Sequence, residues 1–528
     1  MRLIDFYPMK GCYAPGSPVD LQVEMSLSQS RRVQATLEIF HFSQSAGRLS
    51  TVWDLPAGEH SLPLRWTPPS GAQQGYGAHL NLTCLPEGPS AAAQTAFDVL
   101  ANWTRFPRYG FLCDFFPNRF NIAETLGSLA RHHINGLQFY DWQYRHDQLT
   151  APSEEFIDPL GRALSLVTIR DLIQSAHAHG MAAMPYLAVY GASIQFWRQH
   201  PDWGLYDADG KPHTFEDFLG IMNPAAGGPW VQHLLDQCAQ TLQALPWDGL
   251  HVDQYGEPKQ VWNAAGVPVD LALAFHQFIH SLKTAHPGAA VTFNAVGNWP
   301  IEALASAPED FVYIEIWPPT PRFRDLKDIT LNARRLSENR PVIIALYLPA
   351  SQPANLLLAD ALIISAGGAR IELGEEQRLL ADPYFPKHQP LDTPTLAALR
   401  RYHDFQVRYA EWLGPSAAHL EQEDISAPAG VEITCRESES GLAVCLVNLG
   451  SAPDPFWTEA QPFPPVQTAI EVSLPVRRPV ARVLAASPDG PDLSARLVAF
   501  QHKDGRLRVS LPELRVWTTI FIEFEETN

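Results

Sequence analysis

The sequence predicts a multidomain protein in which a central (β/α)8 barrel is flanked by two antiparallel β-domains. Three observations support this fold class. The chain has 528 residues, more than one ordinary domain uses. Eight short apolar runs alternate with helix-like stretches between residues 102 and 414. Alternating polar and apolar segments without intervening helices come before and after this region.

The first segment, residues 1–101, is expected to form an Ig-like β-sandwich. It contains short alternating runs such as VDLQVEM, RVQATLEIFHF and YGAHLNLTC. Turn-rich pieces such as LPAGEH and WTPPSG separate these runs. Successive strands without helices between them are typical of a small antiparallel sandwich.

The pattern changes at residue 102, where the predicted barrel begins. Its eight strand-like runs are YGFLCDF, INGLQFYDW, MAAMPYLAVY, GLHVDQYG, AVTFNAVG, FVYIEIW, PVIIALYLP and ARIEL. Helix-like stretches, and one long excursion after the third run, separate them. Repeated βα units of this number favour a closed barrel with enlarged loops over an open doubly wound sheet. No GxGxxG motif follows the first strand, which further disfavours a dinucleotide fold.

The last segment, residues 415–528, is expected to form a C-terminal antiparallel β-sandwich. Alternation returns there in VEITCRE, LAVCLVNLG, AIEVSLPV and WTTIFIEFEE. Neither flanking segment carries a motif of its own. We expect both to pack on the barrel or to extend its substrate groove.

Charge and composition favour a neutral ligand. The formal net charge of −19 and the pI near 5.4 predict repulsion of nucleic acid and of anionic membrane surfaces, so neither is expected as a partner. No run reaches the roughly 18 apolar residues of a membrane helix. The N-terminus lacks the apolar stretch of a signal peptide, so we expect a cytoplasmic protein, or a secreted one if a leader has been removed.

The cysteines predict no metal centre. The chain has 6 of them, and they are scattered without a CxxC motif or a closely spaced Cys/His cluster. His177 and His179 have the HxH spacing of some metal-dependent hydrolases. They lie at the end of a predicted helix and not on a strand, which favours a surface or interhelical role. We therefore expect neither a metal nor another cofactor.

Two of the apolar runs deliver a carboxylate at a strand end. GLHVDQYG carries Asp253 and FVYIEIW carries Glu315. The carboxyl ends of barrel strands form the active site in enzymes of this architecture, so we expect these side chains to meet there. Two such acids suffice to break a glycosidic bond, one attacking or stabilising the sugar and the other protonating the leaving oxygen. The apolar surroundings of Glu315 suit a general acid, because burial raises a carboxyl pKa.

Each of these acids also has a plainer interpretation. Asp253 could cap the loop that follows it, and Glu315 could be a core residue paired with an arginine. Glu257, four residues beyond Asp253, is a rival catalytic acid, which we interpret as loop support.

Other polar and aromatic residues at the predicted strand ends support a sugar ligand. Hydroxyl-rich ligands need convergent hydrogen-bonding groups over an aromatic floor. The candidate substrate-binding residues are Asp141, Tyr140, Trp142, His146, Tyr186, Gln254, Asn294, Trp317 and Glu372.

These same segments resemble the dextranase family of glycoside hydrolases, family 66. The resemblance is carried by TRFPRYGFL, HHINGLQFYDWQYRH, DGLHVDQYGE, VYIEIWPP and ELGEEQRLLADPYFP. It implies an Ig-like domain, a (β/α)8 barrel and a C-terminal β-domain. It also implies α-1,6-glucan as substrate and retention of configuration. On the matching positions it makes Asp253 the nucleophile, Glu315 the acid/base and Asp141 an essential sugar-binding carboxylate.

The chain departs from this family pattern in two respects. Many relatives are secreted, and no leader is visible here. Cyclising relatives carry a carbohydrate-binding insertion late in the barrel, for which there is no room between PVIIALYLP and ADALIISAGG. We therefore expect a retaining endo-acting hydrolase of dextran or isomaltooligosaccharides. The alternatives are a glucanotransferase that forms cyclic or longer isomaltooligosaccharides, and a non-catalytic glucan-binding protein.

Overall fold

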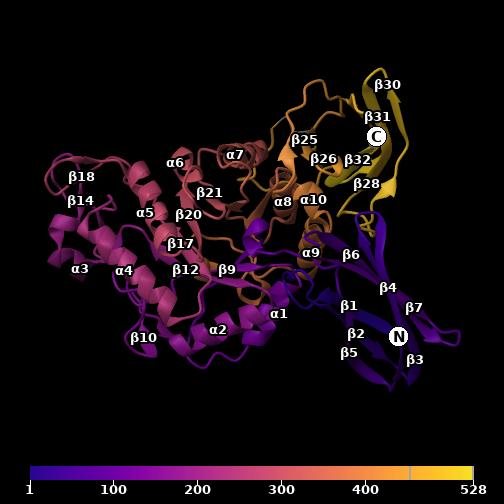
Figure 1. Ribbon diagram of the computed structural model, residues 1–528, viewed down its shortest axis with the longest axis horizontal. Coiled ribbons are helices and arrows are strands. Elements are labelled where there is room, and N and C mark those ends of the chain that lie inside the picture. The colour runs from indigo at the N-terminus through magenta and orange to yellow at the C-terminus, as the bar shows by residue number, and fades with distance from the viewer. Residues whose placement is uncertain (451–453, 526–528) are drawn as a thin grey trace.

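The computed structural model describes residues 1–450 and 454–525. Eight parallel strands form a barrel, and several of them are labelled in Figure 1. In sheet order, the strands are β8 (Tyr109–Leu112), β9 (Gly136–Phe139), β12 (Ala182–Ala188), β17 (Gly249–Asp253), β20 (Ala290–Val296), β21 (Val312–Glu315), β22 (Val342–Ala345) and β23 (Gly368–Ile371). The Phe111 amide donates to the Leu373 carbonyl oxygen at 3.2 Å, which joins the first strand to the segment after the last. The predicted eight-stranded parallel barrel is confirmed.

Helices follow the barrel strands and cover them on the outside. They are α1 (Ile122–Ala130), α2 (Leu166–Ala178), α4 (Pro229–Ala244), α5 (Leu271–Ala285), α6 (Ile301–Ala305), α7 (Phe323–Leu336), α8 (Pro353–Ser365), α9 (Thr393–Arg408) and α10 (Ala410–Leu413). Polar N-caps set several starts: Ser165, Asp270 and Asp392 each accept a backbone N–H of the first turn. Among the described residues, no helix is long and apolar enough to span a membrane.

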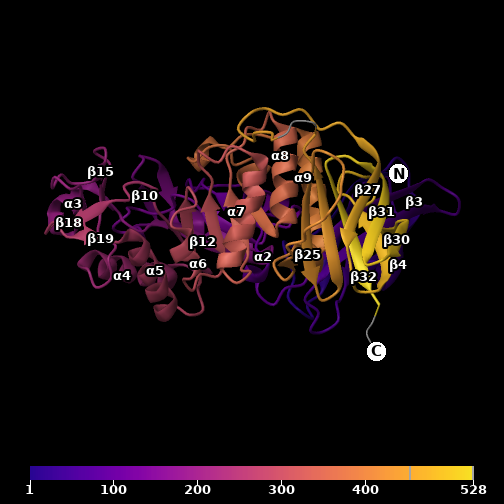
Figure 2. The same cartoon turned by 90° about the horizontal axis from the view of Figure 1, so that it is seen from above.

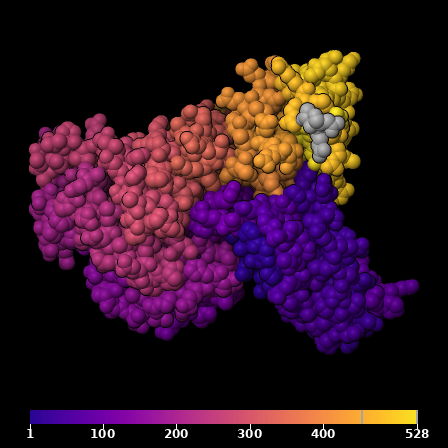
Figure 3. Space-filling view, in the orientation of Figure 1, coloured from indigo at the N-terminus to yellow at the C-terminus, as the bar shows by residue number. Residues whose placement is uncertain are grey.

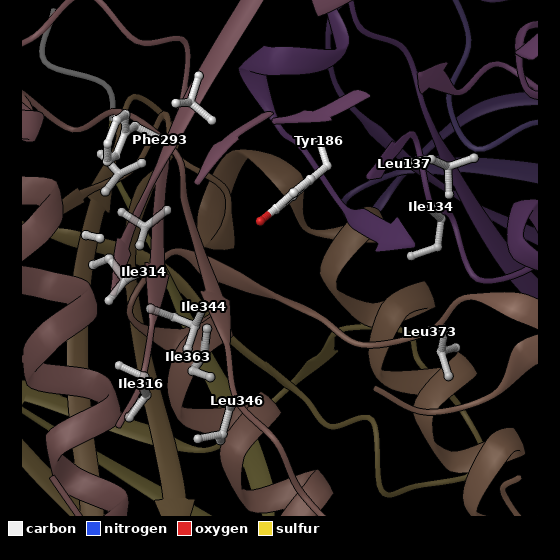
Figure 4. Close-up of a cluster of buried hydrophobic side chains, with 14 of the residues drawn as sticks. Ile134, Leu137, Tyr186, Phe293, Ile314, Ile316, Ile344, Leu346, Ile363 and Leu373 are labelled. Carbon is white, nitrogen blue, oxygen red and sulfur yellow. The ribbon is translucent and has the colours of Figure 1, made fainter. Parts of the chain in front are cut away.

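Side chains of the barrel strands alternate between two apolar layers. Phe293, Ile314 and Ile344 belong to the outer layer, which packs against the helices (Figure 4). Their sequence neighbours point inward, where Tyr313 and Ile343 join the inner layer. In Figure 4 the hydroxyl oxygen of Tyr186, at the end of β12, points away from the Ile134 and Leu137 side chains. This alternation decides which residues reach the mouth of the barrel.

The long excursion after the third barrel strand builds two small antiparallel sheets. One contains β13 (Gly191–Ser193), β16 (Leu219–Ile221) and β15 (Thr214–Phe215). The other joins β14 (Leu205–Tyr206) to β18 (Val261–Asn263) and β19 (Pro268–Val269), which follow β17. With α3 (Ile194–Gln199) they form the end of the molecule farthest from the β-domains (Figures 1 and 2). A small hairpin of β10 (Glu155–Ile157) and β11 (Ala163–Ser165) lies after β9.

The N-terminal segment forms two antiparallel sheets. One contains β1 (Arg2–Pro8), β2 (Val19–Leu27) and β5 (Gly58–Trp66); the other contains β4 (Gln44–Leu55), β3 (Arg31–His41), β6 (Gly75–Leu85) and β7 (Ser90–Asp98). Alternate side chains of β2, β3 and β6 form one apolar core. The antiparallel prediction is confirmed, and the Ig-like assignment stays a prediction.

The C-terminal segment is also antiparallel. A six-stranded sheet contains β24 (Ala418–His419), β25 (Val431–Ser438), β26 (Gly441–Asn448), β32 (Trp517–Phe524), β28 (Val480–Ala486) and β29 (Arg496–Leu497). A three-stranded sheet contains β27 (Gln467–Pro475), β31 (Arg506–Leu514) and β30 (Phe500–Lys503). The two β-domains lie at the same end of the molecule, away from the small sheets (Figure 3). The predicted boundaries at 101/102 and 414/415 fall in connections between elements.

Buried ionic contacts tie the N-terminal domain to the barrel. The Arg108 guanidinium pairs with Asp98 at 2.8 Å and also donates to the Gly11 carbonyl oxygen. The Asp404 carboxylate on α9 accepts hydrogen bonds from the Thr95 hydroxyl and the Ala96 amide. Removing one partner of such a buried pair leaves an uncompensated charge. The barrel and the N-terminal domain are therefore fixed to each other by specific contacts.

Candidate active site

Strand pairing brings Asp253 and Glu315 together at the carboxyl end of the barrel. Asp253 is the last residue of β17, Glu315 is the last residue of β21, and β20 pairs with both strands. Because side chains alternate along a strand, Asp253 shares the inner face with His251, and Glu315 shares it with Tyr313. Both acids line one cavity at the mouth of the barrel.

A single amide group bridges the two acids. The Asn294 Nδ2 atom lies 2.8 Å from Oδ1 of Asp253 and 2.9 Å from Oε2 of Glu315, so it donates to both. The two accepting oxygens can therefore be at most about 5.7 Å apart, the sum of the two hydrogen-bond lengths, which is shorter than the roughly 6.5–9.5 Å between the acids of inverting glycosidases. Asn294 was predicted to bind substrate, and the structure places it between the two acids.

Each of the two carboxyl groups has a pKa above its ordinary value. Burial, followed by the charge of Glu315, raises the pKa of Asp253 to about 7. Burial also raises the pKa of Glu315, against hydrogen bonds from Tyr347, Asn294 and Trp317 that lower it. The Tyr347 hydroxyl lies 2.6 Å from Oε1 of Glu315. Two acids this close resist simultaneous ionisation, so the pair retains one proton toward neutral pH.

We expect Asn294→Ala to move the acidic limb of the kcat/KM profile to higher pH. The amide lowers the pKa of both acids, so its loss raises both and delays the ionisation of the pair. The rate at the optimum should fall roughly 10- to 150-fold, because a hydrogen bond to a charged group contributes about 1.5–3 kcal/mol. A pH–rate profile checks this result. Asn263→Ala, in the β18 turn, is the matched control, and an unchanged acidic limb in the Asn294 variant would contradict the bridging role.

The cavity around the acids has a volume of about 780 Å³, within the range of small-ligand sites. Its wall combines aromatic rings with polar and charged side chains. Seven of the nine predicted substrate-binding residues line it: Tyr140, Asp141, His146, Tyr186, Gln254, Asn294 and Trp317. Burial lowers the pKa of His146 to about 4, so this imidazole is neutral at physiological pH.

Asp141 reaches the cavity through an unusual backbone conformation. Its φ of 52° lies in the left-handed region, which aspartate tolerates better than most residues. The Arg162 guanidinium fixes this turn by donating to the Asp141 carbonyl oxygen at 2.9 Å, and Arg162 also pairs with Asp158 at 2.7 Å. Burial raises the pKa of Asp141 to about 7, and the charge of Arg162 opposes the rise. The Asp141 carboxyl group at the cavity wall therefore has a pKa near neutral pH.

Aromatic rings from several loops build the rest of the wall. The Tyr140 ring stacks on Phe385 with centroids 4.2 Å apart and an interplanar angle of 12°. Trp317, 39% exposed, lies against Tyr347 at 6.1 Å. Exposed ring faces of this kind are suited to packing on sugar rings. Sequence reasoning missed further lining residues, namely Tyr255, Phe215, Phe218, Tyr384 and Phe385. For Tyr384 and Phe385, the sequence signal was the pair of aromatic residues in the segment DPYFP.

Two predicted substrate contacts are wrong. Trp142 is fully buried, and its indole N–H donates to the Tyr186 carbonyl oxygen at 3.0 Å. Glu372 is also buried, where it pairs with Arg370 and lies 3.1 Å from the His403 ring. Neither lines the cavity. Glu372 contacts His403 of α9, and the Trp142 ring packs on Trp247, so both are structural residues behind the barrel wall.

Glu257 and Glu315 differ in their exposure and in their partners. Glu257 lies on the rim with 75% of its side chain exposed and a loose contact to Lys259 at 3.5 Å. Glu315 has no arginine partner among the described residues, unlike Glu372. Gln254 lines the cavity, but its amide is engaged with the Trp299 carbonyl oxygen and the Gly256 N–H. Gln254 therefore supports the loop after Asp253.

An (β/α)8 barrel with two facing acids in an aromatic cavity is the arrangement of a glycoside hydrolase. A model of glycosyl hydrolase family 66 matches residues 8–521. The chain belongs to this family.

Curated relatives carry two activities in their names. A cycloisomaltooligosaccharide glucanotransferase of Niallia circulans is 28% identical over 375 residues, which is 65% of this chain and 38% of that protein. A dextranase of Streptococcus salivarius is 20% identical over 446 residues, which is 70% of this chain and 53% of that protein. The chain thus spans about two-fifths to one-half of the length of these relatives.

Solved structures share the fold. A Paenibacillus cycloisomaltooligosaccharide glucanotransferase, solved with cycloisomaltoheptaose, superposes with a TM-score of 0.90 at 20% identity. The match covers 98% of this chain and 99% of that chain. An Anoxybacillus α-amylase gives a TM-score of 0.52 at 14% identity, over 81% of this chain and 99% of that one. At these identities the likeness shows the fold alone.

Proposed function

We propose that this protein is a retaining, endo-acting glycoside hydrolase that cleaves α-1,6-glucosidic bonds of dextran or isomaltooligosaccharides. The observation that carries the proposal is the Asp253–Asn294–Glu315 bridge, which holds two acids at a short separation in an aromatic cavity. The substrate class is supported by the names of the relatives, a dextranase and a cycloisomaltooligosaccharide glucanotransferase. The net charge of −19 also suits a neutral sugar better than an anionic one.

In the first step, Asp253 attacks the anomeric carbon while Glu315 protonates the departing glycosidic oxygen. The C–O bond to the leaving sugar breaks as the ester bond to Asp253 forms, giving a β-glucosyl–enzyme. Asn294 holds the two carboxyl groups in register for this exchange. The proton that the pair retains near neutral pH is the one that Glu315 delivers.

In the second step, Glu315 acts as a base. Its carboxylate takes a proton from water, the water oxygen bonds to the anomeric carbon, and the ester to Asp253 breaks. The product has the α configuration of the substrate, and both acids return to their starting states. The assignment of roles follows the segments DGLHVDQYGE and VYIEIWPP, which resemble the family pattern.

Transfer to a sugar is the second candidate function. Two observations favour it: the glucanotransferase names among the relatives, and a wall of aromatic rings that can hold an acceptor sugar over the covalent intermediate. The two reactions share the first step and differ only in whether water or a sugar hydroxyl attacks the ester.

Incubation with dextran, followed by chromatography of the products, tests the proposal. We expect shorter linear isomaltooligosaccharides. Rings, or oligomers longer than an isomaltooligosaccharide supplied alone, would instead support transfer. Unchanged dextran, with binding still measurable, would contradict both and favour a glucan-binding protein.

We expect Asp141→Asn to damage turnover while leaving the acid pair in place. The asparagine keeps the shape of the side chain but loses the charge of a carboxylate that we propose binds a sugar hydroxyl. A charge-assisted hydrogen bond contributes about 1.5–3 kcal/mol, so kcat/KM should fall roughly 10- to 150-fold. Steady-state kinetics with Asp209→Asn, in an exposed turn, as the control check this loss. A near-normal kcat/KM would show that Asp141 serves only the fold.

A further inference from the structure

The carboxyl end of β8 carries a second group of chemically active side chains beside the aromatic cavity. Cys113 and Asp114 follow β8 directly, and His388 ends the short 3-10 helix η4 (Phe385–Lys387). One donor atom from each of the three lies within 4.8 Å of the other two. Cys113 is buried in the inner layer of the barrel, and the other two are partly buried. The mechanism proposed above uses none of them.

The spacing of two of these side chains fits a shared ion better than a direct bond. Oδ2 of Asp114 lies 3.9 Å from Nε2 of His388, too far for a hydrogen bond. An oxygen and a nitrogen ligand on a tetrahedral zinc ion, each about 2.0–2.2 Å from the metal, lie roughly 3.3–3.6 Å apart, so a shared ion requires these two atoms to approach by only a few tenths of an ångström. The other ring nitrogen of His388, Nδ1, is buried and has no hydrogen-bond partner among the described residues.

The two arginines near the Asp114 carboxylate pair with other acids, so this carboxylate is free to bind a cation. Two guanidinium groups lie near it, but Arg119 pairs with Glu375 at 2.6 Å and Arg162 pairs with Asp158 at 2.7 Å. No hydrogen bond to the Asp114 carboxylate occurs in the part of the chain that the structure describes.

We propose that Cys113, Asp114 and His388 form a binding site for a divalent transition metal ion, with zinc as the best fit. A thiolate, an imidazole and a carboxylate are all zinc ligands, and a water molecule completes the tetrahedron. The thiolate disfavours magnesium and calcium, which prefer oxygen ligands. Binding releases the proton of Cys113, because the thiolate is the ligand.

The site would connect two parts of the cavity wall. Cys113 and Asp114 extend from β8, whereas His388 belongs to the segment that places Tyr384 and Phe385 at the cavity. A bound ion would therefore cross-link this segment to the barrel and hold Phe385 against Tyr140. The sequence predicted no metal, because the Cys/Asp pair and the histidine are far apart along the chain.

Cobalt titration of the chelator-stripped protein tests the proposal. Co²⁺ bound to a thiolate gives a charge-transfer band in the near ultraviolet. We expect one equivalent of Co²⁺ to produce this band and Zn²⁺ to abolish it by displacement. We also expect Cys113→Ser to lose the band, with Cys238→Ser, a buried cysteine on α4, as the matched control that keeps it.

The other two ligands are tested by affinity. His388→Gln and Asp114→Asn should weaken Zn²⁺ binding by at least the roughly 10- to 100-fold that loss of an outer-shell partner costs. Thermal unfolding of each metal-free variant shows that it is folded; if Cys113→Ser fails to fold, His388→Gln decides the question. Absence of the band in the unaltered protein, its persistence in Cys113→Ser, or wild-type affinity in a folded His388→Gln variant would overturn the proposal.

Discussion

We expect Asp253→Gly to abolish cleavage of dextran and to convert an activated α-glucoside into a β-glucosyl azide when azide is added. Loss of the nucleophile should cost more than the roughly 10²- to 10⁴-fold that general acid–base catalysis contributes, because no covalent intermediate can form. The glycine opens a space on the face opposite the leaving group. Azide enters there and displaces the leaving group in one step, which inverts the configuration.

Product configuration is read by proton NMR of the azide adduct. An isomaltoside with a nitrophenyl leaving group is a suitable substrate, because its departure needs little help from Glu315. An α-azide from this variant would contradict the assignment of Asp253 as the nucleophile. The matched control is Glu257→Gln, which removes an exposed acid four residues away and should leave activity near normal.

We expect Glu315→Gly to lose dextran cleavage roughly 10²- to 10⁴-fold, while it retains the first step on an activated substrate. The leaving group of dextran is a sugar hydroxyl and needs a proton, whereas a nitrophenolate does not. The glucosyl–enzyme should accumulate, since no base activates water. Azide then attacks the intermediate and gives the α-azide, the opposite anomer to the one expected from Asp253→Gly.

The two variants form one test of the roles of the acids. A burst of nitrophenolate followed by a slow phase is the kinetic signature expected of the Glu315 variant. If this variant kept dextran activity while Glu257→Gln lost it, Glu257 would be the acid/base. Identical anomers from both variants would contradict the double-displacement mechanism.

Much of the fold follows from local sequence patterns. The eight apolar runs predicted the barrel because parallel strands, buried on both faces, read as continuous apolar segments. Asp253 and Glu315 were found by their positions at strand ends, where the backbone leaves the sheet at the mouth of the barrel. The long excursion was visible as an interruption of the alternating strand and helix patterns. One of its two small sheets, however, pairs β14 with β18, which lies in the loop after the next barrel strand. Such non-local pairing has no signature in one stretch of sequence.

The two wrong contacts have different physical causes. Side chains alternate along a strand, and Ile371 of β23 points inward, so its neighbour Glu372 points outward. For Trp142 the alternation is interrupted, because the left-handed backbone of Asp141 turns the chain after Tyr140. Tyr140 and Asp141 then both line the cavity, and the tryptophan passes behind the wall. A positive φ at an aspartate is not visible in the sequence.

Local sequence patterns also could not predict roles that depend on partners far along the chain. Asn294 was found as a strand-end residue, but its bridge between the two acids depends on the register of β20 with both neighbouring strands. Arg162, which fixes the Asp141 turn, comes from a hairpin that local patterns do not relate to the site. Tyr384 and Phe385 reach the cavity from a segment after the last barrel strand.

The configuration of the first product tests the central claim most directly. Proton NMR during hydrolysis of an isomaltooligosaccharide should show the α signal of the new reducing end first, with the β signal growing later by mutarotation. That order is required if Asp253 and Glu315, held together by Asn294, act by double displacement. A β signal that appears first, or the absence of any α-1,6 cleavage, would contradict it.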